Sequence, residues 1–161
     1  MNFVIRSIQP EDNPAMAMII RTVMPEFGAG GEGFAIHDVE VDNLFESYNN
    51  SQCAYFVCEL NGKLVGGGGV APLAGGDATT CELKKMYFLK EARGKGLGKQ
   101  VLARCTQRAR EMGYKQFYLE TFNTMHEAIA LYDRSGFKKM SHALGNTGHF
   151  ACDVFYMMEL V

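Results

Sequence analysis

The chain has no apolar run long enough to cross a membrane. A membrane-spanning helix needs about 18 consecutive apolar residues, and no such run occurs in the 161 residues. Residues 1–13, MNFVIRSIQPEDN, also lack the basic start and the continuous apolar stretch of a secretion signal. We therefore expect a cytoplasmic protein without a membrane partner.

The chain also lacks paired cysteines. Its five cysteines are an odd number and include no CxxC pair: Cys53, Cys58, Cys81, Cys105 and Cys152. This pattern is typical of reduced core thiols, so we expect no disulfide framework. His142, His149 and Cys152 are close in sequence, but a zinc site usually needs four ligands at tighter spacing. We therefore expect no metal.

No linker, internal repeat or low-complexity tract interrupts the sequence, so we expect one domain over residues 1–161. With 47% hydrophobic and 21% charged residues, the chain is too hydrophobic to be disordered. Hydrophobic periodicity predicts an α/β domain with the order β-α-α-β-β-β-α-β-α-β-β. The expected strands are 3–8, 54–60, 63–73, 79–89, 115–121, 137–144 and 151–160. The expected helices lie around 16–23, 38–48, 97–112 and 125–132.

Two glycine-containing segments predict local backbone features. Asn61-Gly62 stands between two strand-like runs, and this pair suits the two positive φ angles of a type I′ hairpin turn. Gly66 to Gly69 lie inside the second of those runs, where glycine indicates a bulge or a close backbone approach.

The positive charge is concentrated in one segment. Residues 1–83 hold 3 basic and 11 acidic side chains, residues 84–110 hold 9 and 1, and residues 111–161 hold 4 and 6. Such a concentration favours an anionic ligand, although a solvated helix face explains it equally well. The basic residues come without an aromatic stacking platform, so we expect no nucleic-acid partner.

A glycine-rich loop lies inside this basic segment. In Arg93-Gly94-Lys95-Gly96-Leu97-Gly98-Lys99, alternating glycines precede a predicted helix. Exposed N–H groups and the helix dipole make such a loop a diphosphate site. It is not a Walker A loop, because Gln100 follows Lys99 where Ser or Thr is required. The GxGxxG run at 28–33 follows a helix rather than a strand, so we interpret it as a flexible loop.

Two motifs resemble those of the GNAT superfamily of N-acetyltransferases. Residues 93–98 match its R/Q-x-x-G-x-G/A signature, and Asn123 followed by EAIALYDRSGF resembles its second conserved segment. The resemblance covers the whole chain in element order. It implies a central mixed, mostly antiparallel sheet with one splayed parallel pair, flanked by about four helices.

The resemblance also implies that acetyl-CoA is the acyl donor. Backbone groups of Met86 to Phe88 would hold the pantetheine, with Asn123 as a further contact, and the 93–99 loop would hold the diphosphate. The side chains of Lys95, Lys99 and Arg104 would add attraction for the phosphates. The residues expected to bind acetyl-CoA are Met86, Tyr87, Phe88, Arg93, Gly94, Lys95, Gly96, Leu97, Gly98, Lys99 and Asn123.

Two catalytic residues follow from the same match. Glu82 corresponds to the general base of some family members, because an attacking amine must lose a proton. A salt bridge to Lys84, which shares its strand face, or a water chain as the base remain alternatives. Tyr132 corresponds to the general acid for the leaving thiolate, but a core tyrosine explains its apolar helix face equally well. The N–H of Met86 is a candidate oxyanion donor.

The expected reaction is acetyl transfer to a primary amine of a small molecule, a protein or a peptide. The acceptor side would be built from 25–48, which is acidic and suits a cation, and from 143–151, where His149 would line the pocket. A non-catalytic acyl-CoA sensor is the alternative function. A homodimer through the apolar final strand is also open.

Overall fold

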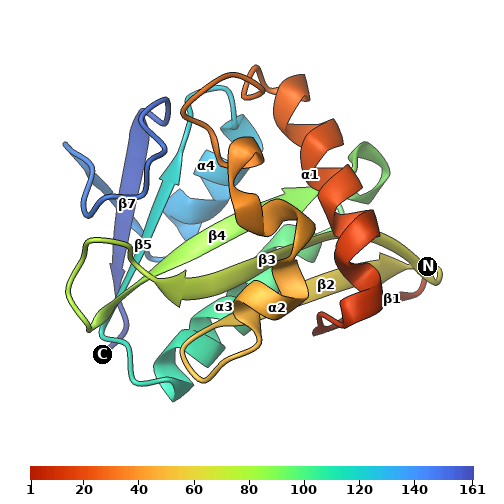
Figure 1. Cartoon of the computed structure of the whole chain (residues 1–161), viewed down its shortest axis with the longest axis horizontal. Coiled ribbons are helices and arrows are strands. Elements are labelled where there is room, and N and C mark those ends of the chain that lie inside the picture. The colour runs from red at the N-terminus through yellow and green to blue at the C-terminus, as the bar shows by residue number, and fades with distance from the viewer.

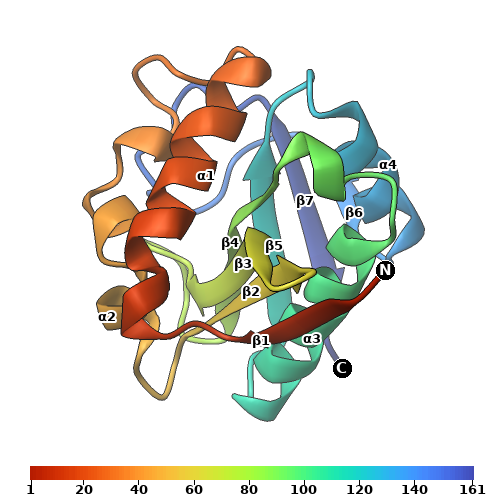
Figure 2. The ribbon, with the colours of Figure 1, turned by 90° about the vertical axis from the view of Figure 1, so that its right-hand side faces the viewer.

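The computed structural model describes all residues, 1–161, as a seven-stranded sheet with helices on both faces (Figures 1 and 2). The strand order is β1-β2-β3-β4-β5-β7-β6, and every neighbouring pair is antiparallel except β4 and β5. The strands are β1 (Phe3–Ser7), β2 (Ala54–Leu60), β3 (Lys63–Pro72), β4 (Thr80–Phe88), β5 (Gln116–Thr121), β6 (Lys138–Met140) and β7 (Val154–Glu159). The helices are α1 (Asn13–Glu26), α2 (Leu44–Tyr48), α3 (Leu97–Glu111) and α4 (His126–Arg134). The predicted fold class is confirmed.

Each face of the sheet has its own apolar core. Helices α3 and α4 cover one face, where Leu97, Val101 and Cys105 are almost fully buried. Helices α1 and α2 cover the other face, where Met16, Ile20 and Leu44 are fully buried. These residues recur at helical spacing, so the amphipathic pattern of each helix determines which face it covers. No helix is long and apolar enough to cross a membrane.

The parallel pair opens toward one end. Strand β4 pairs with β5 only where Thr80 to Glu82 lie beside Gln116 to Tyr118. Beyond that point β4 continues to Phe88, and the two strands diverge (Figure 1). The splay expected from the family resemblance is therefore present, and it leaves a gap between neighbouring strands of one sheet.

A bulge in the β3–β4 pair confirms the prediction from the glycine run. The register shifts between Gly67 and Gly69, and Lys85 opposite has a φ of 51°. A Cβ added at Gly68 would lie 2.9 Å from Cγ of Met86, so the strands approach too closely there for a side chain. The Asn61-Gly62 turn also has the expected positive φ angles, 51° and 81°.

Three predicted element boundaries were wrong. The expected helix over 38–48 is a 3₁₀ turn (η3, Val39–Asp42) followed by the short α2, because Asn43 has a non-helical φ of −133°. The buried Val41 and Leu44 are three residues apart, a spacing that suits a 3₁₀ turn. The helix expected around 16–23 extends over Asn13–Glu26, with Pro25 inside its last turn. Strand β6 stops at Met140, and the loop 141–153 leaves the sheet.

Candidate active site

A cavity of about 690 Å³ lies where β4 leaves β5. Its walls are the end of β4, the last turns of α1, the first turn of α3 and one side of α4. Nine of the eleven predicted acetyl-CoA residues line it: Met86, Tyr87, Phe88, Arg93, Gly94, Gly96, Leu97, Gly98 and Lys99. Lys95 is exposed on the same loop, outside the lining. The glycine loop and the end of β4 therefore face a common space.

The glycine loop presents unpaired amides at the start of α3. Gly94 and Gly96 have φ angles of 71° and 78°, which only glycine adopts without strain. The N–H of Gln100 donates to the carbonyl of Gly96 at 3.2 Å, as the first bond of the helix. The amides of the three preceding residues, 97–99, therefore have no acceptor within the helix. Together with the helix dipole they form a site for an anion.

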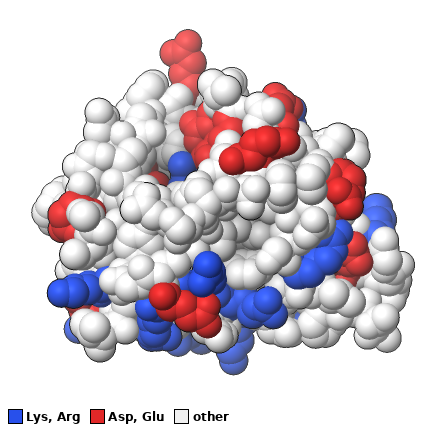
Figure 3. All heavy atoms as spheres, turned by 60° about the horizontal axis from the view of Figure 1, so that its bottom comes forward, with Lys and Arg blue, Asp and Glu red and all other residues white.

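Basic side chains surround this helix, but two of the arginines are engaged elsewhere. Figure 3 shows lysines and arginines gathered along the lower part of the view, the side of the molecule where α3 lies. The guanidinium of Arg93 donates to the carbonyl of Phe88 and to Glu26, both at 2.9 Å. That of Arg104 lies over the Phe56 ring, 5.0 Å from its centroid, outside the cavity lining. Of the predicted phosphate-binding side chains, only Lys99 lines the cavity without an ion pair.

Asn123 lies outside the cavity. Its side-chain amide and its backbone N–H both donate to Asp153, each at 3.0 Å. This pairing ties the end of β5 to the start of β7. In this arrangement the Asn123 side chain does not face the predicted pantetheine space.

Glu82 faces a second, much smaller cavity of about 30 Å³. Glu82 is nearly buried, with 4% of the residue exposed, and its side chain forms no hydrogen bond or ion pair. Its carboxylate oxygens are not fully sealed, since no sealed side-chain oxygen lacks a partner. Lys84 pairs instead with Glu40 at 2.8 Å, so the salt-bridge alternative for Glu82 is not supported. Burial, with the charge of Glu120, raises the pKa of Glu82 to about 7, although Lys84, His149 and Lys85 oppose the shift.

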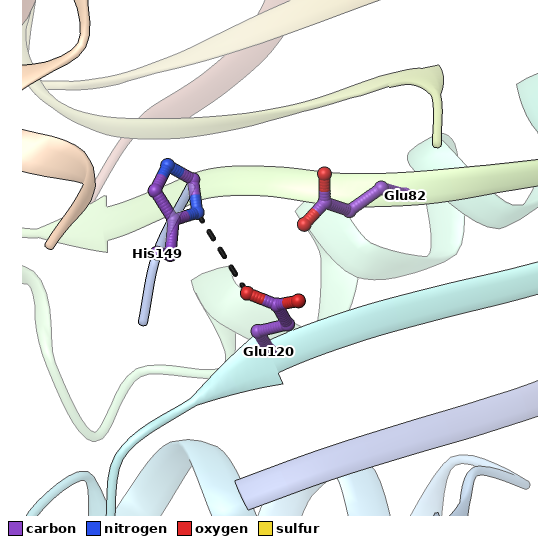
Figure 4. Close-up of side chains that lie close together, drawn as sticks. All are labelled: Glu82, Glu120 and His149. Carbon is purple, nitrogen blue, oxygen red and sulfur yellow. Dashed lines mark ion pairs between the residues drawn. The ribbon is translucent and has the colours of Figure 1, made fainter. Parts of the chain in front are cut away.

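Glu120 and His149 share this small cavity with Glu82. The three side chains converge from β4, β5 and the 141–153 loop, and their nearest ligand-type atoms lie within 4.8 Å of one another (Figure 4). The imidazole Nδ1 of His149 is 3.8 Å from Glu120, and its Nε2 is 2.8 Å from Asp38. His149 was expected to line the acceptor pocket, and in the structure it lies beside Glu82, the candidate base.

Sequence reasoning missed Glu120. The sequence did contain one signal for it. On β5 the core residues Phe117 and Leu119 point to one face, whereas Glu120 and Tyr118 point to the other. A carboxylate at a half-buried strand position beside the splay is a candidate for function. It was not singled out because pairing of β5 with the strand of Glu82 becomes visible only in the folded sheet.

Tyr87 lines both cavities, so the two lie on either side of this residue. Tyr132 lines neither of them. Its ring packs against Phe137 and Tyr156, with centroids 5.7 and 5.9 Å away. Its hydroxyl forms no hydrogen bond within the chain but keeps some solvent access, since no sealed side-chain polar atom lacks a partner. Burial raises the pKa of Tyr132. Tyr132 therefore has the packing of a core residue and a free hydroxyl.

The acidic segment expected to attract the acceptor is largely neutralised by ion pairs. Lys85 is fully buried and contacts both Asp38, at 2.7 Å, and Glu40. Asp42 pairs with Arg21 at 2.6 Å, and Glu26 with Arg93. Within 25–48 only Glu32 and Glu46 have no ion pair, whereas Glu82 and Glu120 of the small cavity have no lysine or arginine partner.

Comparison with known proteins gives consistent matches over the whole chain. A sequence model of the acetyltransferase (GNAT) family matches residues 16–137. The uncharacterised N-acetyltransferase YjgM of Escherichia coli K12 is 46% identical over 158 residues, which cover 98% of this chain and 95% of that protein. A GNAT-family acetyltransferase structure from Staphylococcus aureus superposes with a TM-score of 0.87 at 21% identity, over 99% of this chain and 100% of the other. A putative acetyltransferase from Salmonella typhimurium, solved with its cofactor acetyl-CoA, gives 0.78 at 22% identity, over 100% of this chain and 95% of the other.

Proposed function

Because the chain belongs to the acetyltransferase (GNAT) family, we propose that it transfers the acetyl group of acetyl-CoA to a primary amine, with Glu82 as the general base. The observation that carries this proposal is that one residue, Tyr87, lines both cavities. The larger cavity has free amides for an anion, and the smaller one has a buried carboxylate. A thioester and an amine placed in these cavities meet beside Tyr87.

The larger cavity suits acetyl-CoA in size and chemistry. The first turn of α3 and Lys99 offer amides and a positive charge to the diphosphate. The splay exposes main-chain groups of Met86 to Phe88, to which the pantetheine amides can hydrogen-bond. The structural neighbour from Salmonella typhimurium binds acetyl-CoA in a fold of the same kind, which supports this placement.

The proposed reaction moves two protons away from the amine nitrogen. Glu82 accepts one from the ammonium, which gives the neutral amine that attacks the thioester carbonyl. The nitrogen–carbon bond forms and the carbon–sulfur bond breaks. The hydroxyl of Tyr132 gives its proton to the leaving thiolate and takes up the second proton of the amine nitrogen, so Tyr132 ends the cycle unchanged. Glu82 then releases its proton to solvent, so the products are the acetylated amine, coenzyme A and one proton.

A mass-spectrometric acceptor screen tests the proposal. Acetyl-CoA and pooled alkylamines, polyamines and peptides are incubated with the protein, and products are scored for an acetyl mass gain. We expect acetylated products from the wild type and a loss of about 10²–10⁴-fold in rate for Glu82→Gln, the range for removal of a general base. Absence of product across the panel, with acetyl-CoA still bound, would support the acyl-CoA sensor instead.

A further inference from the structure

We propose that Glu120 and Glu82 together bind the ammonium group of the acceptor, and that the acceptor is a primary amine on an unbranched methylene chain. This inference rests on the proposed acetyl transfer and specifies its substrate class. It assigns to Glu120 the role of a specificity-determining residue, separate from the base.

Charge balance in the small cavity is the first argument. Lys84 and Lys85 also line the cavity, but their charges are already paired, since Lys84 contacts Glu40, and Lys85 contacts Asp38 and Glu40. No lysine or arginine pairs with Glu82 or Glu120. The imidazole of His149 is 3.8 Å from Glu120 and is hydrogen-bonded to Asp38 on its other side. Two carboxylates therefore face one space with no fixed cation between them.

The orientation of the two carboxylates is the second argument. Glu82 is nearly buried, without a partner, and points into the space bounded by Glu120 and His149 (Figure 4). Glu120 is held in place, because the hydroxyls of Tyr118 and Thr147 donate to its two oxygens at 2.9 and 2.8 Å. Each oxygen keeps a further lone pair for an N–H donor. An ammonium has three donors and would satisfy both carboxylates at once.

The size and walls of the cavity limit the shape of the acceptor. Its volume of about 30 Å³ has room for about two water-sized groups, at roughly 10–15 Å³ each. An ammonium and its first methylene fill that space. Met24, Phe122 and Cys152 form its apolar sides, so a branch on the carbon next to the nitrogen would collide with them. Tyr87 lies at the boundary with the larger cavity, toward the proposed thioester.

Steady-state kinetics with two isomeric amines and one weakly basic amine test the inference. The probes are n-butylamine, its branched isomer sec-butylamine, and trifluoroethylamine, which is mostly neutral at pH 7.5. We expect the wild type to prefer n-butylamine to sec-butylamine. Loss of a charged hydrogen bond costs about 1.5–3 kcal/mol, so Glu120→Gln is expected to raise the KM of n-butylamine about tenfold to a hundredfold. The KM values of trifluoroethylamine and acetyl-CoA stay unchanged.

Glu11→Gln is the matched control, because it removes the same charge from an exposed position that forms no ion pair and lies outside the proposed acceptor side. It is expected to leave every KM unchanged, whereas equal effects of the two variants would point to general charge steering and overturn the inference. Glu120→Asp keeps the charge and is expected to give an intermediate KM. Melting curves and acetyl-CoA binding confirm that each variant is folded.

Calorimetric titration of n-butylammonium into the coenzyme A-saturated protein separates this inference from the proposed function. Glu120-dependent binding without any acetylated product would overturn the acetyl transfer and leave the ammonium site standing. Acetylation of n-butylamine with an unchanged KM in Glu120→Gln would overturn the site and leave the transfer standing. The ammonium site is also overturned if the wild type neither binds nor acetylates n-butylamine.

Discussion

The buried carboxyl of Glu82 links activity to pH. Its pKa is raised to about 7, by burial and by Glu120, against the opposing charges of Lys84, Lys85 and His149. A general base must be ionised, so kcat/KM is expected to rise with pH through an inflection near 7. A pH–rate profile with n-butylamine measures it, after correction for ionisation of the amine. Glu82→Gln should lack this inflection, and an inflection that persists in the variant would assign it to another group.

The same burial carries a cost in stability. A glutamate has a pKa of about 4.3 when unfolded, so a value of about 7 in the folded chain makes ionisation favour unfolding. The stability present below pH 4.3 is lost as pH rises to 7, by at most about 4 kcal/mol. Glu82→Gln is therefore expected to raise Tm relative to wild type at pH 8 and to do so less at pH 5. A Tm difference between Glu82→Gln and wild type that does not change with pH would contradict this.

Tyr132 combines a core ring with a free hydroxyl, and the two can be tested separately. Tyr132→Phe keeps the packing against Phe137 and Tyr156 and breaks no hydrogen bond. We expect its Tm to stay close to that of wild type while kcat falls about tenfold or more, the lower part of the range for losing a proton donor. Thermal melting measures the Tm of the variant, and saturation kinetics measures its kcat. An unchanged kcat would leave Tyr132 with its packing role alone.

At the scale of an element, helix α3 has one glycine at each end, and the two glycines can be compared as a matched pair of mutation sites. Gly96 precedes the first residue of the helix and Gly113 follows its end, with φ angles of 78° and 87°, and a methyl group added at either position would meet no other atom. Alanine at either position costs about 1–2 kcal/mol of backbone strain. We expect both variants to lose similar stability in denaturant unfolding. Only Gly96→Ala should raise the Kd of acetyl-CoA, because it disturbs the amides at the first turn.

Sequence patterns predicted most elements, because each depends on local periodicity and turn chemistry. The hairpin at Asn61-Gly62, the bulge at 66–69 and the stripe of α3 are all local features of this kind. The broken 38–48 helix was not predicted, since its shape depends on ion pairs from Asp38 and Glu40 to Lys85, which is distant in sequence. The loop 141–153 likewise leaves the sheet because Leu144 and Thr147 bond to side chains of β5.

At the scale of the whole molecule, the charges counted along the sequence differ from the charges that remain unpaired in the fold and can attract a ligand. The acidic segment 25–48 suggested an approach surface, but its carboxylates are mostly paired. Glu82 was found through the family resemblance, whereas Glu120 required the three-dimensional pairing of β4 with β5. The basic segment is different, because Lys95 and Lys99 remain exposed and unpaired. Its positive field is therefore available to an incoming anion.

That field predicts salt-dependent binding of acetyl-CoA. Exposed charges are screened over a Debye length of about 10 Å at 0.1 M salt and about 3 Å at 1 M, so the Kd of acetyl-CoA is expected to rise steadily across this range. Lys99→Gln should weaken binding at low salt and flatten the slope, since Lys99 lines the cavity. Lys138→Gln, an equal charge change on exposed β6, should do neither. Calorimetry at four salt concentrations measures the slopes, and equal slopes for Lys99→Gln and wild type would show that main-chain amides alone hold the diphosphate.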